Sequence, residues 1–94
     1  MAFYKLTPSA YDDLNRIYLY GLKRFGEKQA DIYYHALIDQ FEKLTINPLH
    51  YPSDETQSGY RRCVFKQDVI YYRQMDDFIE ITTILGRQNH NDWL

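Results

Sequence analysis

The hydrophobic periodicity of the chain changes once, near residue 60, and this change restricts the fold more than any other feature. Between residues 8 and 46, apolar side chains recur every three or four positions, which is the spacing of one face of an α-helix. From Tyr60 onwards the period is two, which is the spacing of a strand with one buried face. Helices followed by strands predict an α+β fold, with the helices packed on one face of a sheet.

Local signals place the first elements. The short apolar segment Phe3–Leu6 predicts a strand, and Thr7-Pro8 predicts the start of a helix, because threonine caps a helix and proline is tolerated at its first position. Asp12 and Asp13 lie in the early turns, where the helix dipole favours negative charge. Gly26 predicts the end of this helix.

A second helix is predicted over residues 27–46, and a loop over residues 47–59. The tight turn between the helices predicts an antiparallel helical hairpin. Three strands are predicted at Tyr60–Lys66, Val69–Met75 and Phe78–Leu85. Their connections, at Gln67-Asp68 and Asp76-Asp77, are so short that the strands should form an antiparallel meander.

Size and composition exclude several classes of protein. The 94 residues predict a single domain spanning residues 1–94. The net charge of −2 argues against a general nucleic-acid binder, and we expect no direct sequence-specific nucleic-acid binding. Cys63 is the one cysteine, and because it lies within a predicted strand we expect its side chain to be a small buried hydrophobe. No metal site or cofactor is expected, because His35, His50 and His90 lack ligand spacing. With no apolar run of about 20 residues and no signal-like N-terminus, we expect a cytoplasmic protein without membrane contact.

The element order and several local signatures together resemble the ParE/RelE toxin superfamily, over essentially the whole chain. The signatures are Leu14-x-x-Ile17-Tyr18, Phe25-Gly26, Asn47-Pro48, Gly59-Tyr60-Arg61, Val69-Ile70-Tyr71-Tyr72 and Ile81-x-x-Ile84-Leu85. The resemblance implies the order β-α-α-β-β-β, with the helical hairpin on one face of a small, mainly antiparallel sheet. It also implies the toxin component of a type II toxin–antitoxin system.

The superfamily contains two activities, and residue types decide between them. RelE-type members cleave messenger RNA on the ribosome, which requires groups that move protons and hold a phosphate. Cys63, Asp68 and Gly86 stand where the resemblance would place such groups. The remaining weak catalytic candidates are Arg61, Arg87 and His90, and an arginine stays charged and does not accept a proton.

The sequence therefore favours the ParE-like branch, whose members poison the cleavage complex of DNA gyrase without catalysis and are associated with plasmid stabilisation. Two alternatives stay open. The first is a ribosome-dependent mRNA endoribonuclease, and the second is an inactive member that only binds its antitoxin.

We expect target contacts on a face built from Gly59–Arg62 and Ile84–Arg87. The candidates for binding the target are Arg61, Arg62, Arg87, Gln88, His90 and Trp93. Arg61 and Arg62 should point to opposite faces of the sheet, because side chains alternate along a strand. For Trp93, packing against its own domain is as well supported as binding to the target.

The resemblance also implies a cognate antitoxin, ParD-like or of another family, which forms a hetero-oligomer with the toxin. Its C-terminal part would fold on the toxin, placing a helix in the groove of the helical hairpin and a strand along the sheet. The candidate antitoxin-binding residues are Leu14, Tyr18, Leu22, Tyr33, Tyr34 and Arg73.

Overall fold

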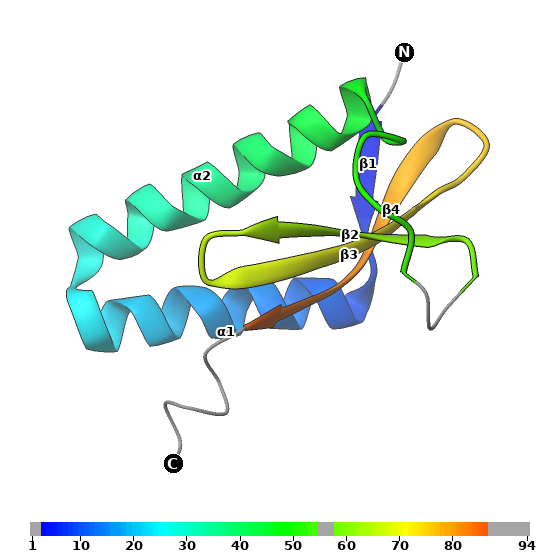
Figure 1. The fold of residues 1–94 in the computed structure, drawn as a ribbon. Coiled ribbons are helices and arrows are strands. Elements are labelled where there is room, and N and C mark those ends of the chain that lie inside the picture. The colour runs from blue at the N-terminus through cyan, green and yellow to red at the C-terminus, as the bar shows by residue number, and fades with distance from the viewer. Residues whose placement is uncertain (1–2, 55–57, 87–94) are drawn as a thin grey trace.

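The computed structural model describes residues 3–54 and 58–86 and confirms the predicted order of elements (Figure 1). The elements are β1 (Phe3–Leu6), α1 (Pro8–Phe25), α2 (Glu27–Ile46), β2 (Tyr60–Phe65), β3 (Asp68–Gln74) and β4 (Phe78–Gly86). The turn predicted at Gln67-Asp68 is wrong by one residue. Lys66 adopts a positive φ of 54°, so the chain reverses earlier and Asp68 already pairs with Phe65 in the sheet.

The four strands form one sheet in the order β1-β4-β3-β2. The predicted antiparallel meander of β2, β3 and β4 is confirmed, and β1 adds to it parallel to β4. A bulge in β4 pairs Tyr71 with Thr83 but Tyr72 with Ile81. The extra residue changes the side-chain alternation, which is why both Ile81 and Ile84 are buried although an odd number of positions separates them.

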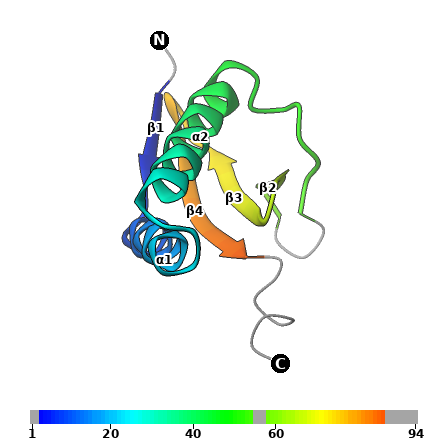
Figure 2. The same ribbon diagram turned by 90° about the vertical axis from the view of Figure 1, so that its left-hand side faces the viewer.

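Both helices lie on one face of this sheet, and both contact β4 (Figure 2). The predicted helix ends are confirmed: the Thr7 side chain accepts a hydrogen bond from the amide of Ala10 at 3.1 Å, and Pro8 is the first helical residue. Gly26 ends α1 with a φ of 93°, a conformation that glycine adopts without strain. No helix in the part of the chain that the structure describes is both long and apolar enough to cross a membrane.

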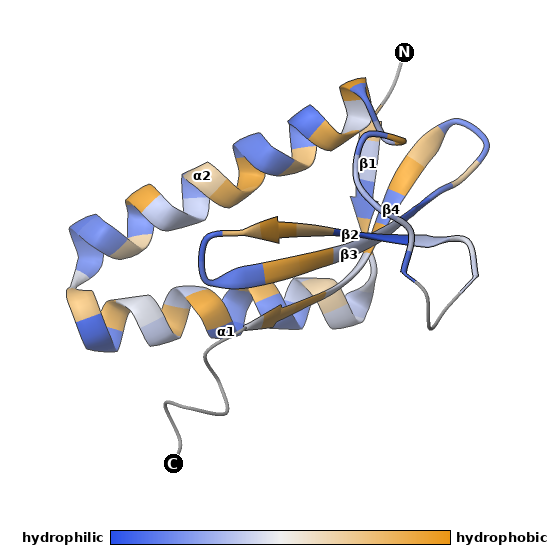
Figure 3. Ribbon diagram, viewed as in Figure 1, coloured by the Kyte–Doolittle hydropathy of each residue, from blue (hydrophilic) through white to orange (hydrophobic). Residues whose placement is uncertain are grey.

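The core lies between the helical hairpin and the sheet. Apolar and polar residues alternate along the helices, while apolar residues predominate in parts of β2, β3 and β4 (Figure 3). The fully buried side chains with the largest volumes are Tyr72, Phe41, Leu37, Leu44, Ile70, Ile81, Ile84 and Cys63. Cys63 is therefore the small buried hydrophobe that the sequence predicted, and burial raises the pKa of its thiol.

Tyr72 is buried at the centre of the sheet, with its hydroxyl donating a hydrogen bond to the carbonyl of Pro48 at 2.6 Å. Burial raises the pKa of Tyr72 to about 12. An unfolded tyrosine ionises near pH 10, so between about pH 10 and 12 the unfolded state loses this proton first. The free energy of unfolding should therefore fall as the pH rises through that window, and the contribution is fully present below pH 10.

We expect Tyr72→Phe to remove this part of the alkaline loss of stability. At neutral pH the variant should be less stable by about 1 kcal/mol, because its hydrogen bond to Pro48 is lost. Urea unfolding of both proteins, measured from pH 7 to 11.5, gives the difference directly. An identical pH dependence above pH 10 would show that Tyr72 does not contribute to it.

Candidate functional site

The two segments expected to form one target-binding face come near each other at Arg62 and Ile84 and diverge toward Tyr60 and Gly86, because Arg62 pairs with Tyr71 and Ile84 pairs with the adjacent Ile70. Tyr60, at the start of β2, pairs with Arg73, whereas Gly86, at the end of β4, pairs with Asp68. Asp68 and Arg73 are five positions apart on β3, which is roughly 17 Å along a strand. The two segments therefore do not lie side by side along their whole length, because the start of β2 and the end of β4 are at opposite ends of the sheet, and their role in target binding stays a prediction.

The arginines of β2 point to opposite faces of the sheet, as predicted. Arg61 shares the helix-covered face with Cys63, and its guanidinium donates a hydrogen bond to the carbonyl of Tyr51 at 2.7 Å. Arg62 is exposed on the uncovered face. The other target-binding candidates lie outside the described residues: Arg87, Gln88, His90 and Trp93.

Two of the six antitoxin-binding candidates lie away from the helical hairpin's surface. Leu14 is 4% exposed and belongs to the core. Arg73 lies on the uncovered face of the sheet, with its guanidinium 5.4 Å from the ring centre of Tyr60 and 2.9 Å from the carboxylate of Glu80. Arg73 is therefore positioned to contact a partner on the face opposite the helices, and Leu14 to support the hairpin from inside.

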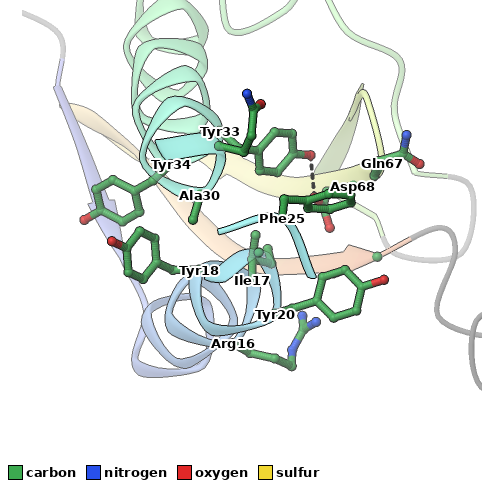
Figure 4. A pocket seen from close by; sticks show the side chains of 13 residues that line it. Arg16, Ile17, Tyr18, Tyr20, Phe25, Ala30, Tyr33, Tyr34, Gln67 and Asp68 are labelled. Atoms are coloured by element: carbon green, nitrogen blue, oxygen red, sulfur yellow. Dashed lines mark hydrogen bonds between the residues drawn. The ribbon is translucent and has the colours of Figure 1, made fainter. Parts of the chain in front are cut away.

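Three other candidates come together in a groove of about 470 Å³ between the hairpin and one end of the sheet. This hairpin groove is formed by the C-terminal half of α1, the N-terminal half of α2 and the end of the sheet at Asp68 and Gly86. Tyr18 and Tyr34 lie together on one side of it, and Tyr33 lies on the other side near Asp68 (Figure 4). The rings of Tyr18 and Tyr34 meet edge to face, with centres 5.7 Å apart. Leu22, the sixth candidate, is half-buried on α1 and is not among the lining residues.

The groove forms because the two helices are in close contact at one point and leave apolar side chains exposed beyond it. The two helices approach closely at Gly21, where an added Cβ would lie 3.3 Å from the Cβ of Ala30. Beyond this point Phe25, the last residue of α1, is 63% exposed and lines the groove. The end of the hairpin is thus open, and apolar surface that no helix or strand of the described chain covers is a common feature of binding sites.

Two tyrosine hydroxyl groups donate hydrogen bonds to carboxylates at the edges of the hairpin groove. Tyr18 donates a hydrogen bond to Asp31 at 2.6 Å, which raises the pKa of the Tyr18 hydroxyl. Tyr33 donates one to Asp68 at 2.5 Å, and Asp68 is only 5% exposed. Among residues 3–54 and 58–86, no three histidine, cysteine, aspartate or glutamate side chains are grouped to hold a metal ion. The tyrosine and phenylalanine rings that line the groove are suited to binding an apolar surface.

The sequence did not indicate a second role of Asp13, whose position at the start of a helix was explained by the dipole alone. The carboxylate of Asp13 accepts a hydrogen bond from the amide of Ile84 at 3.0 Å, and Arg16 donates to the carbonyl of Ile84 at 3.0 Å. β1 pairs with β4 only as far as Ile81. At Ile84 the side chains of Asp13 and Arg16 therefore make the backbone hydrogen bonds that a neighbouring strand would otherwise make. The spacing of Asp13 and Arg16, three residues apart on one helix, was the available signal.

We expect Asp13→Ala to lower the free energy of unfolding by about 1–3 kcal/mol, because it leaves the amide of buried Ile84 without its acceptor. The neighbouring change Asp12→Ala is the matched control and should stay within about 0.5 kcal/mol, since Asp12 is exposed. Chemical denaturation of the two variants compares them. Equal losses would mean that the hydrogen bond to Ile84 contributes nothing specific.

The fold and the groove define a class: a small α+β protein whose open helical hairpin offers a tyrosine-lined binding surface. Residues 4–90 match the family model described as the ParE toxin of the type II toxin–antitoxin system parDE. The chain therefore belongs to the ParE toxin family, which confirms the resemblance drawn from the sequence. It is a ParE-type toxin of a type II toxin–antitoxin system.

Individual relatives agree with this assignment. The chain is 34% identical over 71 residues to Toxin ParE1 of Caulobacter vibrioides, which covers 74% of each protein. Among solved structures, the chromosomal ParDE system of P. aeruginosa matches with a TM-score of 0.80 at 20% identity, covering 92% of this chain and 96% of that one. The conserved hypothetical protein HP0894 of Helicobacter pylori matches with a TM-score of 0.59 at 15% identity, covering 94% and 97%. At these identities, the solved structures show a common fold.

Proposed function

We propose that this toxin acts by inhibiting DNA gyrase, holding the enzyme in its cleavage complex with DNA, and that a cognate antitoxin neutralises it. Membership of the ParE toxin family supports this proposal over most of the chain. The choice of a non-catalytic mechanism rests on the burial and hydrogen bonding of Asp68 on β3. Its buried carboxylate accepts a hydrogen bond from Tyr33, and a negative group there would repel a phosphate.

Two neighbouring positions support the same choice. Cys63 is 1% exposed and its thiol pKa is raised, so at neutral pH it is a buried neutral group. Arg61 is engaged with the carbonyl of Tyr51, and as an arginine it does not accept a proton. Cleavage of RNA through its 2′-hydroxyl requires a proton acceptor. Arg61 and Cys63 supply none, while Asp68 is 5% exposed and its carboxylate already accepts a hydrogen bond from Tyr33. We therefore propose that the toxin binds gyrase and catalyses no reaction itself.

The antitoxin is proposed to occupy the hairpin groove with an apolar helix face. Tyr18 and Tyr34 offer large rings with fixed geometry, and tyrosine is enriched among residues that dominate binding energy. Tyr33 and Leu22 would extend this contact along the hairpin. Arg73, on the uncovered sheet face, would pair with an acidic side chain of a second antitoxin segment, giving a toxin–antitoxin hetero-oligomer.

Induced expression in bacteria tests the proposal. A gyrase inhibitor should cause filamentation and a DNA-damage response, and co-expression of the protein encoded by an adjacent short reading frame should restore growth. Arrested translation with cleaved messages would instead identify an endoribonuclease. Normal growth with high toxin levels would contradict both activities and leave an inactive antitoxin-binding protein.

A further inference from the structure

We propose that the C-terminal segment, residues 87–94, docks into the hairpin groove of its own chain. In this arrangement Trp93 and Leu94 cover the apolar middle of the groove, and Arg87 pairs with Asp68. The inference goes beyond the proposed function, because it concerns the free toxin and requires neither gyrase nor an antitoxin.

The first support is the place where the described chain ends. Gly86 is the last residue of β4, and it lines the hairpin groove. It is also the register partner of Asp68, which lines the groove as well. The eight residues that follow therefore start at the groove itself.

The second support is the pattern of these eight residues. Six polar residues, Arg87 to Asp92, precede the apolar pair Trp93-Leu94. At about 3.3 Å for each extended residue, Trp93 can reach roughly 23 Å from Gly86. Gly86 itself lines the groove, so this reach is measured from the groove's own edge. A tryptophan side chain gains free energy when its large apolar surface is buried, and the groove offers apolar surface of that kind.

The third support is charge complementarity. Asp68 is 5% exposed and its carboxylate accepts a hydrogen bond from Tyr33, and a cation beside a carboxylate adds a charge-assisted hydrogen bond. Arg87 follows Gly86 directly and is the one basic residue, histidine aside, in the last eight positions. An arginine at this position can bind a carboxylate through two parallel hydrogen bonds.

This docking leaves part of the groove for a partner. Tyr33 and Asp68 lie on one side of the groove, and Tyr18 and Tyr34 lie on the other (Figure 4). The segment reaches the side of Tyr33 and Asp68 first, because Gly86 pairs with Asp68. The Tyr18–Tyr34 side would remain available to the antitoxin, and the antitoxin would have to displace the segment to reach Tyr33.

Trp93 is the one tryptophan of the protein, so its fluorescence reports on this segment alone. In the native full-length chain, we expect blue-shifted emission and several-fold weaker quenching by acrylamide than in the urea-unfolded chain. Asp68→Asn should increase the quenching toward the unfolded value. The exposed turn residue Asp77 provides the control, and Asp77→Asn should leave the quenching unchanged.

Nuclear Overhauser contacts in the wild-type protein test the location, even if Asp68→Asn fails to fold. We expect contacts from the Trp93 indole to the rings of Tyr33 and Phe25. Native emission and quenching equal to those of the unfolded chain would overturn the proposal, as would a buried indole without contacts to the groove. A shift that appears only at high protein concentration, or only with antitoxin present, would also overturn it and assign the groove to a second copy or to the antitoxin.

Discussion

Replacing Phe41 with alanine is expected to lower the free energy of unfolding by about 3–5 kcal/mol. Phe41 is fully buried near the C-terminal end of α2, where its ring lies edge-on to that of Tyr4 with the centres 5.5 Å apart. The substitution removes apolar contacts and leaves a cavity between the helix and the sheet. Because a small protein has only about 5–15 kcal/mol of stability in total, urea unfolding should show a large decrease in the midpoint.

Leu19→Ala is the control for this experiment. Leu19 lies on α1, is 58% exposed and does not line the hairpin groove, so its loss should change stability by no more than about 0.5 kcal/mol. Similar decreases for the two variants would contradict the assignment of the core to the space between α2 and the sheet.

Replacing Tyr34 with alanine is expected to weaken antitoxin binding by about 2 kcal/mol or more, which corresponds to roughly a thirtyfold rise in Kd. Tyr34 lines the hairpin groove and is half-buried against Tyr18, so part of its ring is free to contact a partner. Isothermal titration with the purified antitoxin measures the change. The prediction rests on the proposed antitoxin site.

Tyr11→Ala provides the control, because Tyr11 lies on α1, is 59% exposed and does not line the groove. Its Kd should stay within a factor of about two of the wild-type value, a difference of less than 0.5 kcal/mol. Circular dichroism should confirm that both variants are folded. Unchanged binding by a folded Tyr34→Ala protein would place the antitoxin elsewhere on the toxin.

Local signals predicted most of the secondary structure. Thr7-Pro8 and Gly26 fixed the ends of α1 because capping and a positive φ depend on single residues. The apolar stripe of α2 gave both its length and its buried side. The start of β3 was the exception, since it depends on the backbone conformation of Lys66, which is not a residue that usually adopts a positive φ.

Features that depend on contacts between distant residues were not predictable from local patterns. The bulge in β4 puts both Ile81 and Ile84 on the buried face, which strict alternation does not allow. The hydrogen bond from Ile84 to Asp13 joins residues 71 positions apart. Arg16 completes the same contact through its hydrogen bond to the carbonyl of Ile84.

The candidate site was predicted in part. Tyr18, Tyr33 and Tyr34 were expected among the antitoxin-binding residues, and the structure brings these three to one groove. Leu14 was also expected to bind the antitoxin, but it is buried in the core. The helical spacing of apolar residues does not distinguish a core position from one at the edge of a groove. The antitoxin and target contacts of these residues stay predictions.

The most direct test of the account is a plasmid cleavage assay with purified DNA gyrase and purified toxin. If the toxin holds gyrase in its cleavage complex, linear plasmid should accumulate after detergent and protease treatment, in proportion to the toxin added. Prior addition of the antitoxin should abolish the linear product. Unchanged gyrase products at a saturating concentration of folded toxin, together with cleavage of messenger RNA on ribosomes, would contradict the account.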